Sequence, residues 1–516
     1  SVQIKWNKLT GATNYQIYRY DSAKKKYVKL KTVSSSKSSY TDKKREVENG
    51  VSLIVKGLND FGIEIDEGML SETDEKGAYG PYTQSKRKDI YQAYVKSLVE
   101  QGLAYPCFMT EEELATIREK QESEKLLPGV YGEFAKYRDI TVEEAQKRIE
   151  NGDEYVVRLK SPGKEDKRIK FKDVIKGEIE MPENILDVVL LKKDGTPTYH
   201  FAHVVDDHLM RTTHVIRGDE WISSVPIHLQ LFWLCGLKPP KYAHISPIMK
   251  EENGGKRKLS KRKDPEAAVS YYSEVGYPKG AIWEYLMTLA NSNYEDWRLA
   301  NPNEDIDNFK FSFSKMSKAG ALFDMVKLAD VSKNYICRLS AEEVYEMVTD
   351  WAKENNKKLY KLLVDDEEYA KAIFAIERGN AKPRKDISAW TDVENYVSYF
   401  YSELWDRKFD FPDNLSNDDM IEILELYKQI YDENVSSDDW FPQVRDMAET
   451  IGYAKAPKVY KKDPDSYKGH VGDVAGVIRV AATGRRNTPD LYEILQVLGK
   501  DEVMKRFDEA IESLRG

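Results

Sequence analysis

The sequence predicts an α/β part followed by an all-α part. In the first forty residues, short runs that alternate apolar and polar positions are separated by turn residues, as in β-strands. Between residues 46 and 175, three runs with helical spacing are followed by two short strand-like runs. After Ile282, apolar residues recur at helical spacing almost to the C-terminus. Together these patterns predict an α/β domain that is joined to a helical region.

Length and composition fit several folded domains. A chain of 516 residues predicts roughly three to five domains. With 41% hydrophobic and 32% charged residues, the composition favours globular domains over disorder. The net charge of −9 argues weakly against a nucleic-acid partner. Phosphate binding, however, depends on a local basic face and not on the average charge, so that class stays open.

Cysteine usage and the lack of long apolar runs bear on the compartment. No run approaches the roughly 20 apolar residues of a membrane span, and the first residues lack the apolar core of a signal peptide. The three cysteines lie far apart, at positions 107, 235 and 337. They form no disulfide framework, which is typical of a reducing cytosol. We therefore expect a cytoplasmic protein with no membrane partner.

The individual elements follow from spacing and from turn residues. The first part of the chain predicts strands at 2–6, 15–19 and 27–30. The pattern then predicts helices at 46–58, from Pro81 through Val99 and at 111–124, with strands at 154–160 and 167–175.

A basic loop is the first candidate for chemistry. Residues 256–263 hold six Lys or Arg in eight positions and directly follow Gly254-Gly255. A loop with flanking glycines and clustered cations can close over a triphosphate and stabilise charge on a pyrophosphate leaving group. Composition alone fits a solvated basic loop, or a non-specific nucleic-acid patch, equally well.

Six of the seven histidines fall between residues 200 and 244, which raises the possibility of a metal site. No two of them have the i, i+4 spacing that brings two ligands to one face of a helix. We therefore predict no metal there. Asp206 and Asp207 could be a metal or acid/base pair, but structural carboxylates are the favoured interpretation.

Four short motifs, taken in order, indicate a family. They are Asp-Gly-Thr-Pro-Thr-Tyr at 194–199, Val-Val-Asp-Asp-His at 204–208, Val-Ile-Arg-Gly-Asp-Glu-Trp at 215–221 and Lys-Leu-Ser-Lys-Arg at 258–262. Their order and spacing resemble the second half of the catalytic domain of bacterial glutamyl-tRNA synthetases, which are class I aminoacyl-tRNA synthetases. The resemblance extends from about Thr41 to the C-terminus.

The resemblance implies a fold and a set of domains. The expected fold is α/β plus all-α, with an incomplete Rossmann-type catalytic domain and a short β fragment at the start. Residues 1–40 lie outside this resemblance; with Trp6, Gly11-Ala12, Tyr15 and Tyr18 they resemble part of a fibronectin type III domain, and we expect a fibronectin type III-like fragment there. The segments that the synthetase resemblance implies are the rest of the first catalytic half at 41–100, an acceptor-arm-binding insertion at 101–185, the second catalytic half at 186–275, a stem-contact domain at 276–340 and a helical anticodon-binding domain at 341–516. Glutaminyl enzymes end in β-barrels, so the helical periodicity speaks against them.

The basic loop takes a specific role from the resemblance. Residues 258–262 resemble the second signature of the class, usually written KMSKS. Lys261 matches the position that binds the ATP phosphates, and Lys258 supports it. Ser260 and Arg262 belong to the same ATP-binding set, and Mg²⁺ would accompany ATP. Lys315-Met316-Ser317-Lys318 spells the signature more literally, but it lacks the preceding glycines and the basic cluster, so we expect it to be structural or to face tRNA.

The amino-acid pocket is expected in the second half of the sheet. Arg217 matches the carboxylate-binding arginine of the family, and a planar guanidinium suits a carboxylate better than Lys does. Tyr199 matches a substrate-contacting tyrosine, and Glu220 and Trp221 match positions near the amino acid and the adenylate. His203 stands where some relatives carry Asn. We expect Tyr199, Arg217 and Trp221 to face one cleft, although aromatic core residues remain the alternative for the two rings.

Two departures from the family pattern stand out. Many relatives carry a Cys-x-Cys motif and a further cysteine in the insertion, where this chain has Cys107-Phe108-Met109 and Tyr137, so we expect no zinc. The His-Ile-Gly-His type motif of class I enzymes does not occur either. Residues 1–40, which resemble part of a fibronectin type III domain, precede the point where the family pattern resumes. A chimeric gene product would account for that junction.

The implied reaction is ATP-dependent activation of L-glutamate and its transfer to tRNA(Glu), by an expected monomer. Because the His-Ile-Gly-His motif is missing, we expect aminoacylation by these 516 residues to be weak or absent. The alternative is a tRNA-binding protein without catalysis. A fibronectin-type adhesion protein is a poor third hypothesis, because it explains less than a tenth of the chain.

Overall fold

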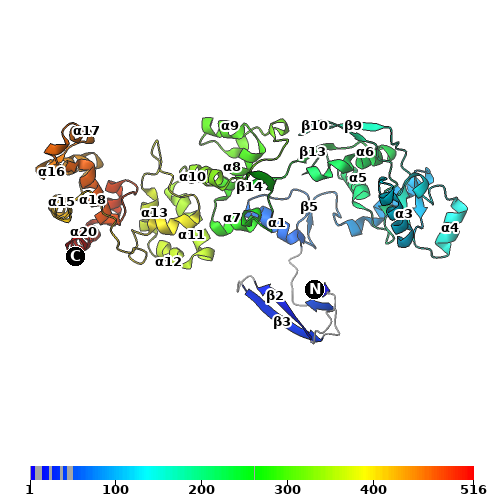
Figure 1. Ribbon diagram of the computed structural model, residues 1–516, viewed down its shortest axis with the longest axis horizontal. Coiled ribbons are helices and arrows are strands. Elements are labelled where there is room, and N and C mark those ends of the chain that lie inside the picture. Colours follow the sequence, from blue (N-terminus) through cyan, green and yellow to red (C-terminus); the bar gives the residue numbers. More distant parts are fainter. Residues whose placement is uncertain (1, 6–13, 22–25, 35–38, 43–49, 261) are drawn as a thin grey trace. The chain divides into compact units, whose positions relative to one another are not determined.

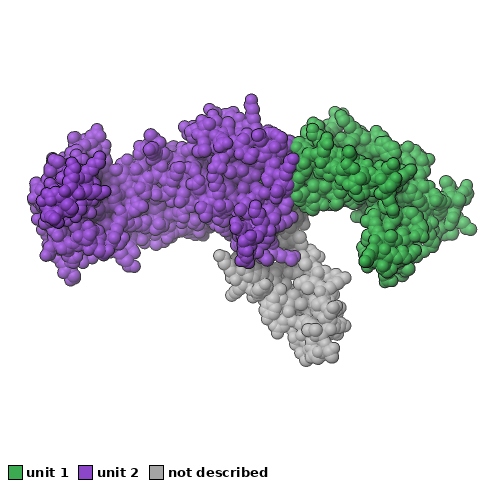
Figure 2. Space-filling view, turned by 45° about the horizontal axis from the view of Figure 1, so that its top comes forward, with its two compact units in different colours: residues 1–244 green, residues 245–516 purple. Residues whose placement is uncertain are grey.

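The computed structural model describes residues 2–5, 14–21, 26–34, 39–42, 50–260 and 262–516 (Figure 1). The chain divides into two compact units, Ser1–His244 and Ile245–Gly516, which are coloured separately in Figure 2. The division falls inside the predicted segment 186–275.

The start of the chain forms two antiparallel ladders. Strand β1 (Val2–Lys5) pairs with β4 (Ser39–Asp42), and β2 (Asn14–Asp21) pairs with β3 (Lys26–Ser34). The strands predicted in this region are thus present, and β4 is an addition. Helix α1 (Gly50–Asp60) follows, and the first residues of the helix predicted at 46–58 lie outside the described part of the chain. A short hairpin of β5 (Gly68–Met69) and β6 (Glu75–Lys76) comes next.

Three helices form the apolar centre of the first unit. Helix α2 (Lys88–Glu100), which the Pro81–Val99 pattern predicted, buries Tyr91, Val95 and Leu98 at helical spacing. It packs against α5 (Tyr199–Leu209), and α5 in turn packs against α6 (Val225–Leu234) (Figure 1). These helices carry one continuous core cluster together with the neighbouring strands.

A buried ion pair joins the segment before α2 to α5. Arg87 Nε donates to Asp206 Oδ1 at 2.9 Å, and the Tyr91 hydroxyl donates to Asp206 Oδ2 at 2.7 Å. The Arg87 side chain is 3% exposed and that of Asp206 is 23% exposed. Burial is the main cause that raises the pKa of Asp206, and both partners oppose that shift. Asp206 is therefore a structural carboxylate, in agreement with the favoured interpretation.

Arg87→Ala is expected to destabilise the first unit by about 3–5 kcal/mol, because it leaves a largely buried carboxylate without its cation. Equilibrium urea unfolding measures the loss. Arg118→Ala is the matched control, since Arg118 is 73% exposed and lies 3.9 Å from Glu122; its expected cost is below about 0.5 kcal/mol. Equal losses in the two variants would contradict a special role for the buried pair.

Two sheets flank these helices. The first is antiparallel, in the order β11 (Val189–Leu191), β8 (Val156–Leu159), β7 (Ala104–Cys107). The second has the order β10 (Gly177–Pro182), β9 (Arg168–Asp173), β13 (Lys241–Ile245), β12 (His214–Gly218). Strands β9 and β13 are parallel, and Asp173 is the partner of Tyr242 in the register. Strand β9 belongs to the predicted insertion, so the insertion and the second catalytic half share a sheet.

The remaining elements of the first unit are short. Helix α3 (Glu111–Ser123) matches the helix predicted at 111–124 and begins with a capping box between Thr110 and Glu113. Helix α4 (Val142–Glu150) is capped by Thr141.

The second unit is helical apart from two short strand pairs, as the sequence predicts. The hairpin of β14 (Met249–Glu252) and β15 (Gly255–Lys258) opens it, and β16 (Tyr453–Ala454) pairs with β17 (Gly469–His470). Its helices are α7 (Val269–Val275), α8 (Lys279–Ala290), α9 (Tyr294–Ala300), α10 (Met325–Ile336), α11 (Ala341–Asn355), α12 (Lys357–Asp365), α13 (Glu367–Ala375), α14 (Val393–Val397), α15 (Asn417–Ile430), α16 (Ser437–Thr450), α17 (Pro457–Tyr460), α18 (Val471–Thr483), α19 (Leu491–Leu498) and α20 (Lys500–Arg515). In the described part of the chain, no helix is long and apolar enough to cross a membrane.

Candidate active site

Three of the predicted substrate residues lie together in the first unit. Tyr199 opens helix α5, Arg217 lies near the end of β12, and Trp221 is in the short 3₁₀ helix Asp219–Ser224 that follows. The ring centroids of Tyr199 and Trp221 are 4.5 Å apart. The Arg217 guanidinium lies 5.8 Å from the centroid of the Trp221 ring. The structure therefore brings a cation and two aromatic rings together, as the sequence predicts.

Two nitrogens of the Arg217 guanidinium have partners, and the third has none. Its Nε donates to His244 Nε2 at 3.1 Å. Its Nη2 lies 3.3 Å from His228 Nδ1 and 3.4 Å from the Trp221 carbonyl oxygen. Its Nη1 is shielded from solvent and has no hydrogen-bond partner among the described residues. A buried donor without a partner is costly, so Nη1 is the natural receptor for an acceptor on a ligand.

Three histidines lie near Arg217, and burial keeps all three neutral. Burial lowers the pKa of His200 and of His244, and it lowers the pKa of His228 to about 2. The positive charge of Arg217 acts in the same direction on all three. The site thus combines one guanidinium cation with neutral imidazoles, which suits an anionic ligand. Over the part of the chain that the structure describes, no group of three or more His, Cys, Asp or Glu could hold a metal ion.

The neutrality of His228 predicts a pH-dependent stability. The unfolded chain binds a proton at His228 below about pH 6.5, whereas the folded chain does so only near its folded pKa of about 2. The unfolded state therefore binds more protons between these values, and stability falls as the pH drops. We expect the neutral His228 to lower the free energy of unfolding by about 1.4 kcal/mol as the pH falls from 7.5 to 5.5. Urea unfolding of the wild type and of His228→Asn at both pH values measures this, and an identical pH dependence in the two proteins would contradict it.

His203 and Glu220 have different surroundings. His203 is buried, and its Nδ1 pairs with Asp207 one turn along α5. Its Nε2 lies 3.0 Å from the Tyr242 hydroxyl, and its ring stacks at 6.0 Å on Tyr199. His203 therefore supports the cluster from within the core. Glu220 is exposed and folds back over Gly218, where an added Cβ would meet its Oε2 at 2.2 Å.

The basic loop belongs to the second unit and is organised around one carboxylate. The β14–β15 hairpin turns at Asn253-Gly254, both with positive φ. After β15, Asp264 accepts two parallel hydrogen bonds from Arg257, at 2.6 and 2.7 Å, and one from the Ser260 backbone N–H at 2.8 Å. The Arg257 bonds are the main cause that lowers the pKa of Asp264.

The loop cations thus divide into two groups. Arg257 is committed to Asp264 and Glu252, whereas Lys258 and Arg262 are exposed. Lys261, the predicted phosphate-binding residue, lies outside the described residues. Asp264 thus anchors the Arg257 side chain and the Ser260 backbone, while Lys258 and Arg262 stay exposed.

The segment 315–318 is tied to its surroundings by its backbone. The Lys315 carbonyl accepts from the Ser292 N–H at 3.1 Å, and the Lys318 carbonyl accepts from the Ser246 hydroxyl at 2.9 Å. These contacts fit the structural role predicted for this second copy of the signature.

In the predicted insertion, aromatic and cationic side chains meet at Phe108 and Tyr137, two positions where the resemblance implied cysteines in the family. The Arg148 guanidinium lies 4.4 Å from the Phe108 ring centroid and 5.1 Å from that of Tyr137. Arg148 also donates to the Tyr137 hydroxyl at 2.8 Å and to Asp153 at 2.7 Å. A cation that contacts two adjoining rings therefore cross-links this part of the predicted insertion.

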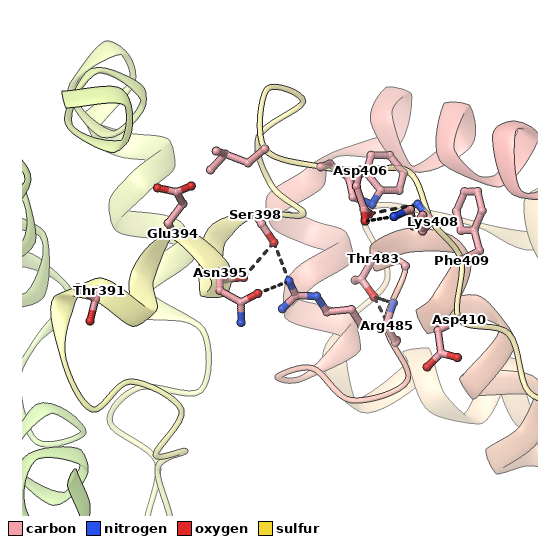
Figure 3. Close-up of a pocket in the computed structure, with 13 residues that line it drawn as sticks. Thr391, Glu394, Asn395, Ser398, Asp406, Lys408, Phe409, Asp410, Thr483 and Arg485 are labelled. Atoms are coloured by element: carbon pink, nitrogen blue, oxygen red, sulfur yellow. Dashed lines mark hydrogen bonds and ion pairs between the residues drawn. The ribbon is translucent and has the colours of Figure 1, made fainter. Parts of the chain in front are cut away.

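The C-terminal helices build a polar cavity of about 770 Å³ in the second unit (Figure 3). Helix α18 ends at Gly484, whose φ of +75° a glycine adopts readily, and an added Cβ there would meet the Lys408 carbonyl oxygen at 2.4 Å. The next residue, Arg485, reaches Asn395 and Ser398 at 2.8 Å each (Figure 3). Arg479, on α18, donates to the Pro489 carbonyl at 2.7 Å and so fixes the segment after the helix.

Comparison with known families assigns both parts of the chain. Residues 39–330 match the family of tRNA synthetases class I (E and Q), catalytic domain, and residues 465–511 match the anticodon binding domain. The class that the fold and site define is thus a class I aminoacyl-tRNA synthetase. Among curated relatives, the glutamate–tRNA ligase of Clostridium perfringens strain SM101 is 54% identical over 90% of this chain and 85% of its own length. The chain therefore belongs to the glutamate–tRNA ligase family.

Other relatives give the same result. The glutamate–tRNA ligase of Clostridium beijerinckii is 50% identical over 91% of this chain and 86% of its own length. A crystal structure of a glutamate tRNA ligase from Elizabethkingia meningosepticum in complex with its amino acid matches with a TM-score of 0.69 and 28% identity. That match covers 92% of this chain and 91% of the solved one. The mixed α/β class I fold with helical anticodon-binding domain is thereby confirmed.

Sequence reasoning missed three residues of the site: Asp173, His228 and His244. The clustering of six histidines between residues 200 and 244 was a signal. It suggested a metal site, however, and not histidines that hold the Arg217 side chain. Asp173 carried no signal, because it precedes His244 by 71 residues.

Proposed function

We propose that this chain uses ATP to activate L-glutamate and transfers the glutamyl group to tRNA(Glu). The observation that carries the proposal is the partnerless, solvent-shielded Nη1 of Arg217 beside Tyr199 and Trp221. A carboxylate acceptor at Nη1 would satisfy this donor and neutralise the guanidinium. The match to glutamate–tRNA ligases supports glutamate as the source of that carboxylate.

The proposed reaction has two steps. The α-carboxylate of glutamate attacks the α-phosphorus of ATP, which enters as its Mg²⁺ complex, and pyrophosphate leaves. A hydroxyl of the terminal ribose of tRNA then attacks the acyl carbon, and AMP leaves. No side chain acts as a nucleophile, so catalysis rests on positioning and charge stabilisation. We assign the phosphate-facing role to Lys258 and Lys261, with Ser260 and Arg262 beside them.

The domain boundaries expected from the resemblance go with this proposal. The insertion at 101–185 would receive the acceptor arm, and the stem-contact domain at 276–340 would follow the catalytic part. The helical domain at 341–516 would bind the anticodon, which the family match over residues 465–511 supports.

Exchange of labelled pyrophosphate into ATP, with L-glutamate and tRNA(Glu) present, tests the activation step. Exchange that requires glutamate and is not supported by glutamine is the expected result. Exchange with glutamine alone would overturn the substrate assignment.

A second candidate function is tRNA binding with little catalysis. It is favoured by one observation: none of the seven histidines forms a His-x-Gly-His motif. Under this proposal, the 516 residues by themselves bind tRNA(Glu) but charge it slowly. Filter binding with a parallel charging assay separates the two candidates, since charging at a rate typical of synthetases would exclude the second.

Binding of tRNA is expected to weaken steeply with salt, because each neutralised phosphate releases counterions. A site that contacts about six phosphates loses roughly a thousandfold in affinity between 50 and 200 mM salt. Filter binding across a salt series measures the slope. An affinity that stays flat would mean that the basic surfaces are not used.

A further inference from the structure

A buried carboxylate–imidazole pair holds the Nε of Arg217, whereas the Nη1 of the same side chain has no partner. Asp173 and His244 are both fully buried. Asp173 Oδ2 lies 2.7 Å from His244 Nδ1, and His244 Nε2 lies 3.1 Å from Arg217 Nε. The three side chains form a line from the end of β9, across β13, to β12.

The donor and acceptor capacities of the three side chains determine where the hydrogen atoms lie along this line. An arginine Nε–H can only donate, so His244 Nε2 must accept with its lone pair. The single hydrogen of the neutral imidazole is then on Nδ1, where it donates to Asp173. Burial lowers the pKa of His244, which agrees with a neutral ring. A ring in the other tautomer, or a charged ring, would point an N–H at the Arg217 Nε–H.

Asp173 itself has no freedom to turn. Its Oδ1 accepts from the backbone N–H groups of Ile175, at 2.9 Å, and Lys176, at 2.7 Å. Its Oδ2 accepts from the His244 backbone N–H at 3.1 Å in addition to the ring. The parallel register that pairs Asp173 with Tyr242 sets these contacts. The orientation of the His244 ring is thus dictated by the sheet and by four hydrogen bonds.

We propose that Asp173 and His244 are positioning residues that select one tautomer and one ring orientation and thereby aim Arg217 Nη1 at the carboxylate of the amino-acid substrate. This inference rests on the proposed function, because it takes Arg217 as the carboxylate receptor. The pair does not touch the substrate. It holds Nε of the guanidinium, while Nη1 stays a solvent-shielded donor without a partner.

Two substitutions of His244 separate the two contacts of its ring. In His244→Gln, the side-chain amide reaches the position of Nε2 and can still accept from Arg217. In His244→Asn, the shorter amide reaches the position of Nδ1 and can still donate to Asp173, but Arg217 loses its acceptor. Calorimetric titration of the full chain with L-glutamate measures the effect. We expect binding to weaken about 10-fold in His244→Asn and less than about 3-fold in His244→Gln.

The relative glutamate affinities of His244→Asn and His244→Gln show whether the Asp173–His244 pair positions Arg217 or only stabilises the fold. If the pair only stabilises the fold, His244→Gln should be the worse variant, since it breaks the buried contact to Asp173. That order, or equal losses in both variants, overturns the inference. Arg217→Ala tests the proposed function separately. Unchanged glutamate binding in Arg217→Ala overturns the assignment of Arg217. Lost binding in Arg217→Ala, together with normal binding in His244→Asn, overturns the positioning role alone.

A second measurement needs no variant and no ligand. Nitrogen chemical shifts of the labelled histidine rings in the full chain distinguish a protonated Nδ1 from a protonated Nε2. His244 is expected to carry its hydrogen on Nδ1 at pH 7.5. A hydrogen on Nε2, or on both nitrogens, overturns the inference.

Discussion

Arg217→Ala is expected to weaken glutamate binding more than any other single substitution in the first unit. The variant removes the cation and the donor Nη1, which lacks a partner in the free protein. Loss of a buried charged contact costs about 2–5 kcal/mol, and every 1.4 kcal/mol is about a tenfold change in the dissociation constant. Calorimetric titration with L-glutamate measures the constant.

Two controls define this prediction. Arg217→Lys keeps the charge but has no planar fork, so we expect it to recover only part of the affinity. The affinity for ATP should stay within about twofold in both variants, because neutral imidazoles and not phosphate contacts surround this cation. Wild-type glutamate affinity in Arg217→Ala would remove Arg217 from the site.

Asp264→Ala is expected to have the largest effect in the second unit. Asp264 joins Arg257 to the Ser260 backbone, and the Lys250 Nζ also lies 3.2 Å from its Oδ1. Without it, Arg257 and Lys250 each keep only their second carboxylate, Glu252 and Glu266, and the backbone of the KLSKR loop loses an anchor. Misplacement of a catalytic group by about 1 Å costs roughly 100-fold in rate. We therefore expect pyrophosphate exchange to fall by about that factor.

Asp264→Asn is the matched variant, since its amide oxygen can still accept from the Ser260 N–H while the charge is lost. Its rate of pyrophosphate exchange should lie between that of Asp264→Ala and that of the wild type. Glu252→Ala is the outer control, because Glu252 contacts the same Arg257 but not the loop backbone. An effect of Glu252→Ala as large as that of Asp264→Ala would show that the charge on Arg257 matters and that the loop anchor does not.

Much of the fold could be predicted from local pattern. The apolar spacing of α2, with Tyr91, Val95 and Leu98 on one face, predicted a helix that the structure confirms. The helical second unit followed from the same periodicity. These elements depend on contacts close in sequence, so the spacing of residues reports them directly.

The candidate site was predicted in part for a similar reason. Tyr199, Arg217 and Trp221 lie within 23 residues, at the start of a helix, near the end of the next strand and just after that strand. They meet around the Trp221 ring. The resemblance to the family named all three. The resemblance gave no role to His244. The clustering of histidines alone suggested a metal site as readily as contacts to Arg217.

The sequence by itself determined the family and the helices, and it singled out Arg217 as the candidate carboxylate receptor. Only the tertiary structure decided which nitrogen of Arg217 lacks a partner. That outcome depends on β9, which comes from the predicted insertion and pairs in parallel with β13. Parallel pairing joins segments that are far apart in the chain, and Asp173 reaches His244 across 71 residues. Local spacing carries no record of such a contact, whereas the sheet register fixes it.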